Sequence, residues 1–405
     1  MHSNNTIEKW EEKTINDVCI VERGGSPRPI KDFITTDGSG VNWIKIGDCS
    51  GKYVTNTAQK ITEEGAKKSR YVKGGDFIIS NSMSYGKPYI LKIDGYIHDG
   101  WFVLRLNKNL VNTDYFYYLL SSNYIKEQYD TLATGAIVQN ISSDLIKKVK
   151  FNLPPLSEQQ RIVGILDEAF ENIEKAKQNT LQNLNNAKEL FENSLNDIFN
   201  NIENSCNFES LQNIYDVING YSFKSQDFNC NNSIRVVKIT NVGVKEFVEE
   251  DNYKLPKDFI DKYKNFVINA NDIVIALTRT IISSGLKVAI VPKSFDKSLL
   301  NQRVACIKST NKNCGKYLYY YLQTHNVYNY VKSKVNELMQ PNLSINDLKN
   351  IPIPAVNYEI QNNIVSQLDE LQEQTKKLEQ IYTQKLQDLD GLKQSILQKA
   401  FNGEL

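Results

Sequence analysis

The sequence predicts an α+β chain in which two tandem modules are each followed by one long helix. Three observations predict it. Residues 153–168 read LPPLSEQQRIVGILDE and residues 353–370 read IPAVNYEIQNNIVSQLDE, which places Ile162 and Ile364 202 residues apart. Tyrosine-rich runs at 115–120 and 317–322 are separated by the same 202 residues. Short strand-like runs precede both copies, and a long fixed period of this kind marks an internal repeat.

The modules are rich in short β-branched or aromatic runs bounded by Gly, Asn or Asp, which favour strands. These runs are 41–48, 76–80 and 100–106 in the first copy, and 236–240, 271–277 and 303–308 in the second. The tyrosine-rich helices follow near 113–129 and 316–333, and their spacing predicts a buried helical face. The predicted segments are a first module at 1–152, a helix at 153–205, a second module at 206–352 and a helix at 353–405.

The two long helices carry apolar or small residues at spacings of three and four, from Ile162 to Ile198 and from Ile364 to Ala400. This pattern is typical of a coiled coil, so the two helices are expected to pack on each other. Ser157 and Asn357 are candidate N-caps. At about 1.5 Å per residue each helix could reach roughly 65 Å.

Composition narrows the function classes. The chain has no long uncharged apolar run, and the start MHSNNTIEKWEEK lacks a signal-peptide core, so we expect a cytoplasmic protein with no membrane span. Six scattered cysteines without a CxxC pair fit reduced thiols. Lys and Arg outnumber Asp and Glu by 20 to 17 in residues 1–150 and by 19 to 13 in residues 207–350, whereas the helical segments are acidic. Basic modules suit a polyanion such as DNA, although ordinary solvated surfaces would look similar.

Motifs for bond chemistry are missing. The three histidines, His2, His98 and His325, form no HExxH motif and stand beside no cysteine pair. The run Gly47–Lys52 has the wrong spacing for a phosphate loop and is followed by Tyr53 in place of Ser or Thr. The sequence therefore predicts a non-catalytic chain that holds no cofactor of its own.

The segments LPPLSEQQRIVGILDE and LKQSILQKAFNGEL (392–405) resemble the central and C-terminal helical segments of type I restriction-modification specificity subunits. The second copy departs from the pattern, with IPAVNYE in place of PPLSEQQ. The resemblance implies two target recognition domains, each reading one half of a split DNA sequence. Antiparallel helices would separate them in a pseudo-two-fold circular arrangement closed by Thr6–Val18.

The same resemblance implies partners. Two methyltransferase subunits would dock on the helices and bring S-adenosylmethionine, and a restriction and translocase subunit would bring ATP and magnesium. Two alternatives stay open on the residues alone. One is a coiled-coil scaffold that does not bind DNA, and the other is a self-sufficient nuclease, which the empty motif search disfavours.

Polar, glycine-containing loops after strands are the best candidates for DNA contact, because base reading needs side-chain donors and acceptors beside phosphate-binding groups. A plain solvated hairpin turn is the alternative for each loop. Thr134–Asn140 is a possible backbone contact to phosphate. The predicted DNA-binding residues are Asn81, Ser84, Tyr85 and Lys87 in the first module, Thr278, Arg279, Thr280 and Lys287 in the second, and, on earlier loops, Arg28 and Lys224.

Overall fold

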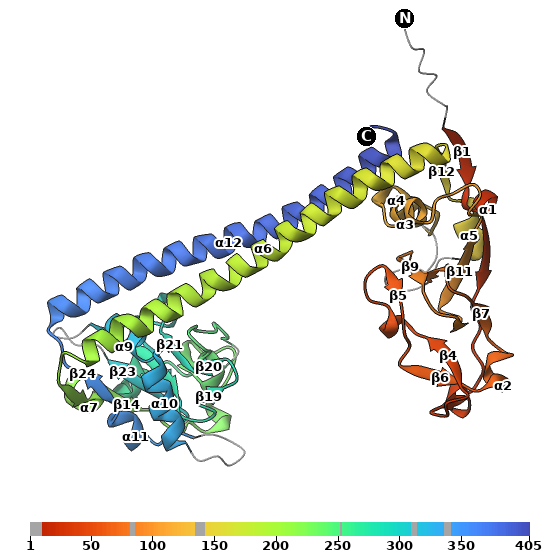
Figure 1. Cartoon of the computed structure of the whole chain (residues 1–405). Helices are drawn as coiled ribbons and strands as arrows, with labels where there is room; N and C mark the ends of the chain where they lie inside the picture. The colour runs from red at the N-terminus through yellow and green to blue at the C-terminus, as the bar shows by residue number, and fades with distance from the viewer. Residues whose placement is uncertain (1–9, 82–85, 134–141, 252, 309–313, 336–341) are drawn as a thin grey trace, which may run out of the picture. The chain divides into compact units, whose positions relative to one another are not determined.

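The computed structural model describes residues 10–81, 86–133, 142–251, 253–308, 314–335 and 342–405. The chain forms two compact units, Met1–Leu181 with Gln384–Leu405, and Gln182–Thr383. Each unit contains one globular module and part of each long helix, α6 (Leu156–Glu203) and α12 (Tyr358–Asn402) (Figure 1). Within the described ranges, no helix is long and apolar enough to cross a membrane.

The first module consists of two five-stranded sheets and a two-stranded pair. The sheet orders are β2-β11-β8-β9-β5, β3-β6-β4-β10-β7 and β1-β12. The strands are β1 (Glu11–Thr14), β2 (Cys19–Arg23), β3 (Ile34–Thr35), β4 (Val41–Ile44), β5 (Tyr53–Val54), β6 (Gln59–Ile61), β7 (Arg70–Val72), β8 (Phe77–Ser80), β9 (Pro88–Leu91), β10 (Gly95–Ile97), β11 (Trp101–Leu106) and β12 (Lys150–Leu153). The helices are α1 (Ile15–Val18), α2 (Glu63–Ala66), α3 (Thr113–Leu120), α4 (Asn123–Ala133) and α5 (Ser143–Lys148).

The second module repeats this plan with two four-stranded sheets and two small pairs. The sheet orders are β14-β23-β18-β21, β16-β15-β22-β17, β13-β24 and β19-β20. The strands are β13 (Phe208–Ser210), β14 (Asp216–Asn219), β15 (Ile234–Val237), β16 (Lys254–Leu255), β17 (Val267–Ile268), β18 (Ile273–Ala276), β19 (Ile281–Ile282), β20 (Gly285–Leu286), β21 (Val288–Ile290), β22 (Ser298–Leu300), β23 (Val304–Lys308) and β24 (Pro352–Pro354). The helices are α7 (Leu211–Ile214), α8 (Phe259–Lys262), α9 (Gly315–Tyr321), α10 (His325–Lys334) and α11 (Ile345–Lys349).

The predicted duplication extends to sheet topology. The run β2-β11-β8-β9 corresponds to β14-β23-β18-β21, and β6-β4-β10-β7 corresponds to β16-β15-β22-β17. Each second sheet contains one parallel pair, β4 with β10 in the first module and β15 with β22 in the second. Two copies of one module therefore underlie the α+β fold that the sequence predicts.

The tyrosine-rich helices belong to the hydrophobic cores, as their periodicity predicts. Tyr115 on α3 and Tyr317 and Tyr320 on α9 are fully buried. Each helix packs between its module's main sheet and the ends of the long helices. Their aromatic side chains are therefore committed to packing.

Within each unit the two long helices run antiparallel. In the first unit, Ile162 and Leu166 near the start of α6 share a core with Leu397 and Phe401 near the end of α12. Lys177 of α6 also forms an ion pair with Asp390 of α12. In the second unit, residues 191–199 of α6 share a core with residues 364–371 of α12. The predicted pairing of the helices is confirmed.

The predicted helix starts differ in detail. The amide oxygen of Asn357 accepts the N–H of Ile360 at 2.9 Å, so Asn357 caps α12 as predicted. The prediction for Ser157 is wrong, because α6 begins one residue earlier, at Leu156, and Ser157 lies in its first turn.

Each module is fastened to its own helix by the same buried glutamine, 202 residues apart. Gln159 accepts the N–H of Asn112 at 2.7 Å and donates to the carbonyls of Leu110 and Pro154 at 3.0 and 2.8 Å. Gln361 accepts the N–H of Cys314 at 2.8 Å in the second unit. A tyrosine-to-aspartate hydrogen bond accompanies each glutamine, Tyr118 to Asp167 and Tyr320 to Asp369. The orientation of each module on its helix is thus specified twice by equivalent contacts.

Candidate nucleic-acid interface

In the first module, three connections meet around the turn between β10 and β11, His98–Gly100. The N–H of Gly24, after β2, donates to the carbonyl of Trp101 at 2.8 Å, and the N–H of Asn81, after β8, donates to Gly100 at 3.0 Å. A Cβ at Gly24 would lie 1.9 Å from the carbonyl oxygen of His98, so only glycine permits this approach. We call residues 24–28, Asn81 and 98–100 the first loop edge.

Asp99 is the centre of the first loop edge. Its carboxylate accepts hydrogen bonds from Ser26 Oγ at 2.7 Å and from the Arg28 guanidinium at 3.0 Å. The Ser26 hydrogen bond, reinforced by Arg28 and opposed by partial burial, lowers the pKa of Asp99. The carbonyl of Asp99 accepts from Asn81 Nδ2 at 2.9 Å. Two predicted DNA-binding residues, Arg28 and Asn81, are therefore brought together, through an aspartate that the sequence prediction did not include.

The remaining predicted residues of the first module are placed differently. Asn81 is only 8% exposed and its amide is used inside the edge, so its contact to Asp99 is a positioning contact. Lys87 is exposed just before β9, with Nζ 5.4 Å from the ring centre of Tyr89. Ser84, Tyr85 and the run Thr134–Asn140 lie outside the described residues.

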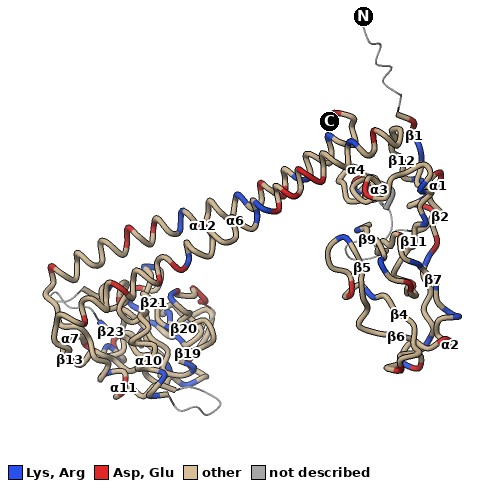
Figure 2. Tube along the Cα trace, in the orientation of Figure 1, with Lys and Arg blue, Asp and Glu red and all other residues tan. Residues whose placement is uncertain are grey.

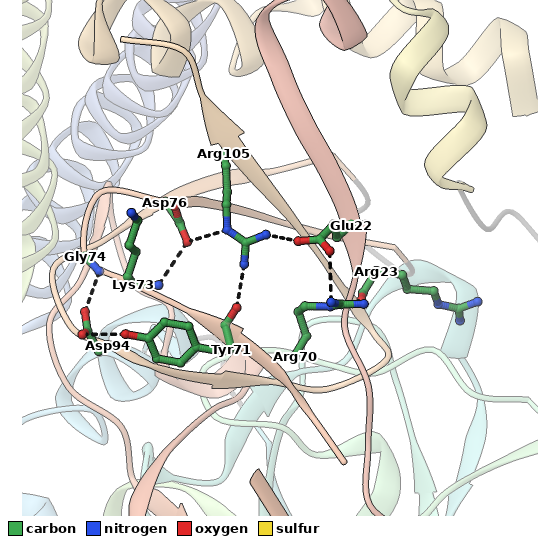
Figure 3. Close-up of polar contacts among 9 residues, drawn as sticks. All are labelled: Glu22, Arg23, Arg70, Tyr71, Lys73, Gly74, Asp76, Asp94 and Arg105. Carbon is green, nitrogen blue, oxygen red and sulfur yellow. Dashed lines mark hydrogen bonds and ion pairs between the residues drawn. The ribbon is translucent and has the colours of Figure 1, made fainter. Parts of the chain in front are cut away.

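A polar network ties the two five-stranded sheets of the first module together (Figure 3). The Arg105 guanidinium on β11 forms an ion pair with Glu22 on β2 and donates to the Tyr71 carbonyl on β7 at 2.8 Å. Arg70 on β7 also reaches Glu22, at 3.0 Å, and its Nε donates to the carbonyl of Arg23 at 3.2 Å. Because Arg23 directly precedes Gly24, this network supports the strand end from which the first loop edge begins.

The second module builds the same edge around the turn between β22 and β23, Asn301–Arg303. The N–H of Gly220 donates to Val304 at 3.1 Å, and the N–H of Leu277 donates to the carbonyl of Arg303 at 2.9 Å. Thr278 forms an antiparallel bridge with Asn342, which adds a fourth segment. We call residues 220–224, 277–287, 301–303 and Asn342 the second loop edge.

The predicted loop of the second module is a hairpin made of β19 and β20. Arg279 at its base is exposed, and its φ of 49° lies in the left-handed region. Thr280 is fully buried, and its hydroxyl has no hydrogen-bond partner among the residues that the structure describes. Lys287 donates to the carbonyl of Ile239 at 3.2 Å, and burial, together with the charge of Arg279, lowers its pKa. Thr278 and Arg279 therefore lie at the surface of the edge, while Thr280 and Lys287 anchor the hairpin.

The earlier loop residue of the second module, Lys224, is exposed four residues after Gly220, as Arg28 is after Gly24. Both signs of charge occur on each module and along both long helices (Figure 2). The modules therefore carry only a small excess of Lys and Arg over Asp and Glu. The place where an anion would bind depends on where cations lie close together.

No group of three His, Cys, Asp or Glu side chains in the part of the chain that the structure describes could hold a metal ion. His98 Nδ1 accepts the N–H of Gly100 at 2.9 Å, and burial lowers the pKa of this imidazole. A neutral His98 thus shapes the turn of the first loop edge.

Sequence reasoning did not select the turn residues of the two edges, among them Asp99, Gln302 and Arg303. They occupy tight turns directly before repeated strands, in the strings YIHDGW and LLNQRV. The internal repeat contains the signal that could have found them. The turns before β11 and β23 are equivalent, so each meets the loops that follow the two neighbouring strands of its sheet.

Two duplicated modules with equivalent loop edges, each fastened to a pair of antiparallel helices, define a tandem two-headed α+β protein. Comparison with known families gives a match over residues 7–183 and 206–387 to the type I restriction modification DNA specificity domain. The chain belongs to this family, and it is a DNA specificity protein, not a scaffold without DNA.

Individual relatives agree with this assignment. The MjaVIII specificity subunit of a type I restriction enzyme from Methanocaldococcus jannaschii is 25% identical over 432 residues, which cover 100% of this chain and 95% of that protein. The EcoAI specificity subunit from Escherichia coli is 34% identical over 172 residues, which cover 42% of this chain and 29% of that protein.

Solved structures share the fold. The crystal structure of the HsdS subunit from Thermoanaerobacter tengcongensis has a TM-score of 0.60 and 19% identity, covering 98% of this chain and 97% of that one. A chain from a structural study of complex assembly and conformational transition in the type I restriction-modification system has a TM-score of 0.73 and 19% identity, with 98% of each chain covered.

Proposed function

We propose that this chain is the sequence-reading subunit of a type I restriction-modification complex, and that each module reads one half of a bipartite duplex target. The observation that carries the proposal is the duplicated loop edge, which gathers Arg28 in one module and Lys224 and Arg279 in the other. A reader built from two related modules suits a duplex, whose backbone presents related surfaces twice.

The long helices would fix the separation of the half-sites. Each module is held to its helix by a buried glutamine and a tyrosine–aspartate pair, so the module should not swivel freely. In this proposal, helix length sets the number of base pairs between the half-sites. The same helices would receive two methyltransferase subunits.

Chemistry in this proposal belongs to the partners, and the chain itself is non-catalytic. The methyltransferase subunits would bring S-adenosylmethionine, and restriction and translocase subunits would bring ATP and Mg²⁺. The complex would act on DNA in the cytoplasm. Relatives named specificity subunits of type I restriction enzymes support this division of labour.

The test is selection of bound DNA from a randomised duplex pool, using the full chain assembled with the methyltransferase of its own system. We expect two short conserved blocks at one fixed gap, and an affinity that falls steeply with salt because Lys and Arg displace counterions from phosphates. Recovery of unselected sequence, or one continuous block, would count against the proposal.

A further inference from the structure

We propose that Arg303, in the turn between β22 and β23, contacts DNA in the second half-site and completes a cluster of three cations with Lys224 and Arg279. The inference rests on the proposed function and adds to it a residue outside the predicted set. It also implies that the two modules hold DNA unequally.

Position is the first argument. The turn 301–303 lies between the two loops of the second loop edge. On one side the N–H of Gln302 donates to the carbonyl of Tyr221 at 3.0 Å, three residues before Lys224. On the other side the N–H of Leu277 donates to the carbonyl of Arg303 at 2.9 Å, two residues before Arg279. Arg303 therefore stands between the two loops that carry the predicted cations.

Charge is the second argument. Lys224, Arg279 and Arg303 are all exposed. Among the described residues, none of their side chains forms an ion pair or hydrogen bond. Burial lowers the pKa of Lys287, and the nearby positive charge of Arg279 lowers it further. Cations whose side chains are unpaired among the described residues favour an anion, and a bound phosphate or a base edge rich in acceptors would relieve the repulsion.

The third argument comes from the first module, where the equivalent turn, 98–100, forms without an arginine. Gly100 occupies the position of Arg303 and accepts the equivalent hydrogen bond, from the N–H of Asn81, at 3.0 Å. The backbone contact of this turn is therefore satisfied by glycine. Within the described ranges, the Arg303 side chain makes no hydrogen bond or ion pair that the turn requires, so it is available to bind a ligand.

The same comparison shows an imbalance between the modules. In the first loop edge, Asp99 pairs with Arg28 at 3.0 Å and so offsets its charge. In the second, Gln302 stands where Asp99 stands in the first, and it carries no charge. We therefore expect the second module to supply more of the salt-dependent affinity.

A backbone detail agrees with a functional role for this cluster. Arg279 adopts a φ of 49°, a conformation uncommon for residues other than glycine. Glycine would adopt this backbone conformation at a lower energetic cost than arginine does. Such conformations recur at functional sites.

The experiment measures DNA affinity of the complete complex with wild-type chain and with Arg303→Gly, the residue that the first module carries at this position. We expect roughly tenfold weaker binding and a salt dependence shallower by about one phosphate contact. Lys349→Ala is the matched control. This half-exposed lysine ends α11, which packs on α7 at the opposite end of the β14-β23 sheet, so its affinity should stay within about twofold of wild type.

The outcomes are distinguishable. Loss confined to targets with one particular base pair identifies a base contact. Loss that is uniform across sequences, and is restored in part by Arg303→Lys, identifies a phosphate contact. Both patterns support the inference. Unchanged affinity and salt dependence in both Arg303→Gly and Arg303→Ala overturn it. If wild-type complex itself shows no sequence preference, the proposed function fails instead. Equal melting temperatures of variant and wild type show that any loss is not misfolding.

Discussion

The fastening of the first module to its helix gives the sharpest stability prediction. Replacing Gln159 with Leu keeps the side-chain volume but removes three hydrogen bonds, to Asn112, Leu110 and Pro154, at 2.7–3.0 Å. Gln159 is 0% exposed, so water cannot replace these partners. At about 1 kcal/mol net for each hydrogen bond, the free energy of unfolding should fall by about 2–4 kcal/mol. For a unit of this size, the melting temperature should drop by roughly 5–15 °C.

The assay is thermal and urea unfolding followed by circular dichroism, with Gln128→Leu as the matched control. Gln128 makes the same kind of two-sided contact, with the backbone of exposed Lys150 at 2.8 and 3.0 Å, but Gln128 is itself only half-buried. Its replacement should cost less than about 1 kcal/mol, because water can satisfy the groups left behind. Equal effects of the two substitutions would refute the reasoning that burial makes the Gln159 contacts strong.

Two further predictions concern the loop edges. Gly220→Ala should destabilise the second unit by roughly 1–3 kcal/mol, because the added Cβ would lie 2.0 Å from the carbonyl oxygen of Asn301. Gly38→Ala is the control in the same unfolding assay. A Cβ at Gly38 would meet nothing within 4 Å, so stability should change by less than about 0.5 kcal/mol. His98→Gln should flatten the pH dependence of the melting temperature between pH 5 and 8. Burial lowers the pKa of His98 in the folded state below its usual 6.5, so the unfolded state binds more protons. The stability of the wild type should therefore decline as pH falls below about 6.5. An unchanged slope in His98→Gln would contradict the assignment.

Much of the fold could be predicted from the sequence because burial imposes periodic patterns. The spacing of Ile162, Leu166 and their counterparts 202 residues later predicts two helices with matched apolar faces, and the structure buries those faces. The same periodicity predicts that the tyrosines of α3 and α9 lie in the core, and the structure buries Tyr115, Tyr317 and Tyr320.

The loop edges were harder to predict because they depend on pairing between distant strands. The run RVACIK predicts a strand that starts at Arg303, whereas β23 begins at Val304 and leaves Arg303 on the turn. Nothing local to that run indicates that Gln302, just before it, meets Tyr221, or that Arg303 meets Leu277, which lies 26 residues earlier. The sequence predicts Thr280 at a surface because it is a polar residue in a glycine-containing loop, and nothing in that loop indicates that its side chain is buried.

The most direct test of two independent reading heads is to select bound sequences with an altered second loop edge. A chain carrying Arg279→Ala and Arg303→Ala, assembled with its methyltransferase, should lose sequence preference in one block and keep the other block and the gap unchanged. A reciprocal Arg28→Ala chain should affect only the other block. Degeneration of both blocks by either variant would contradict the claim that each module reads its own half of the target.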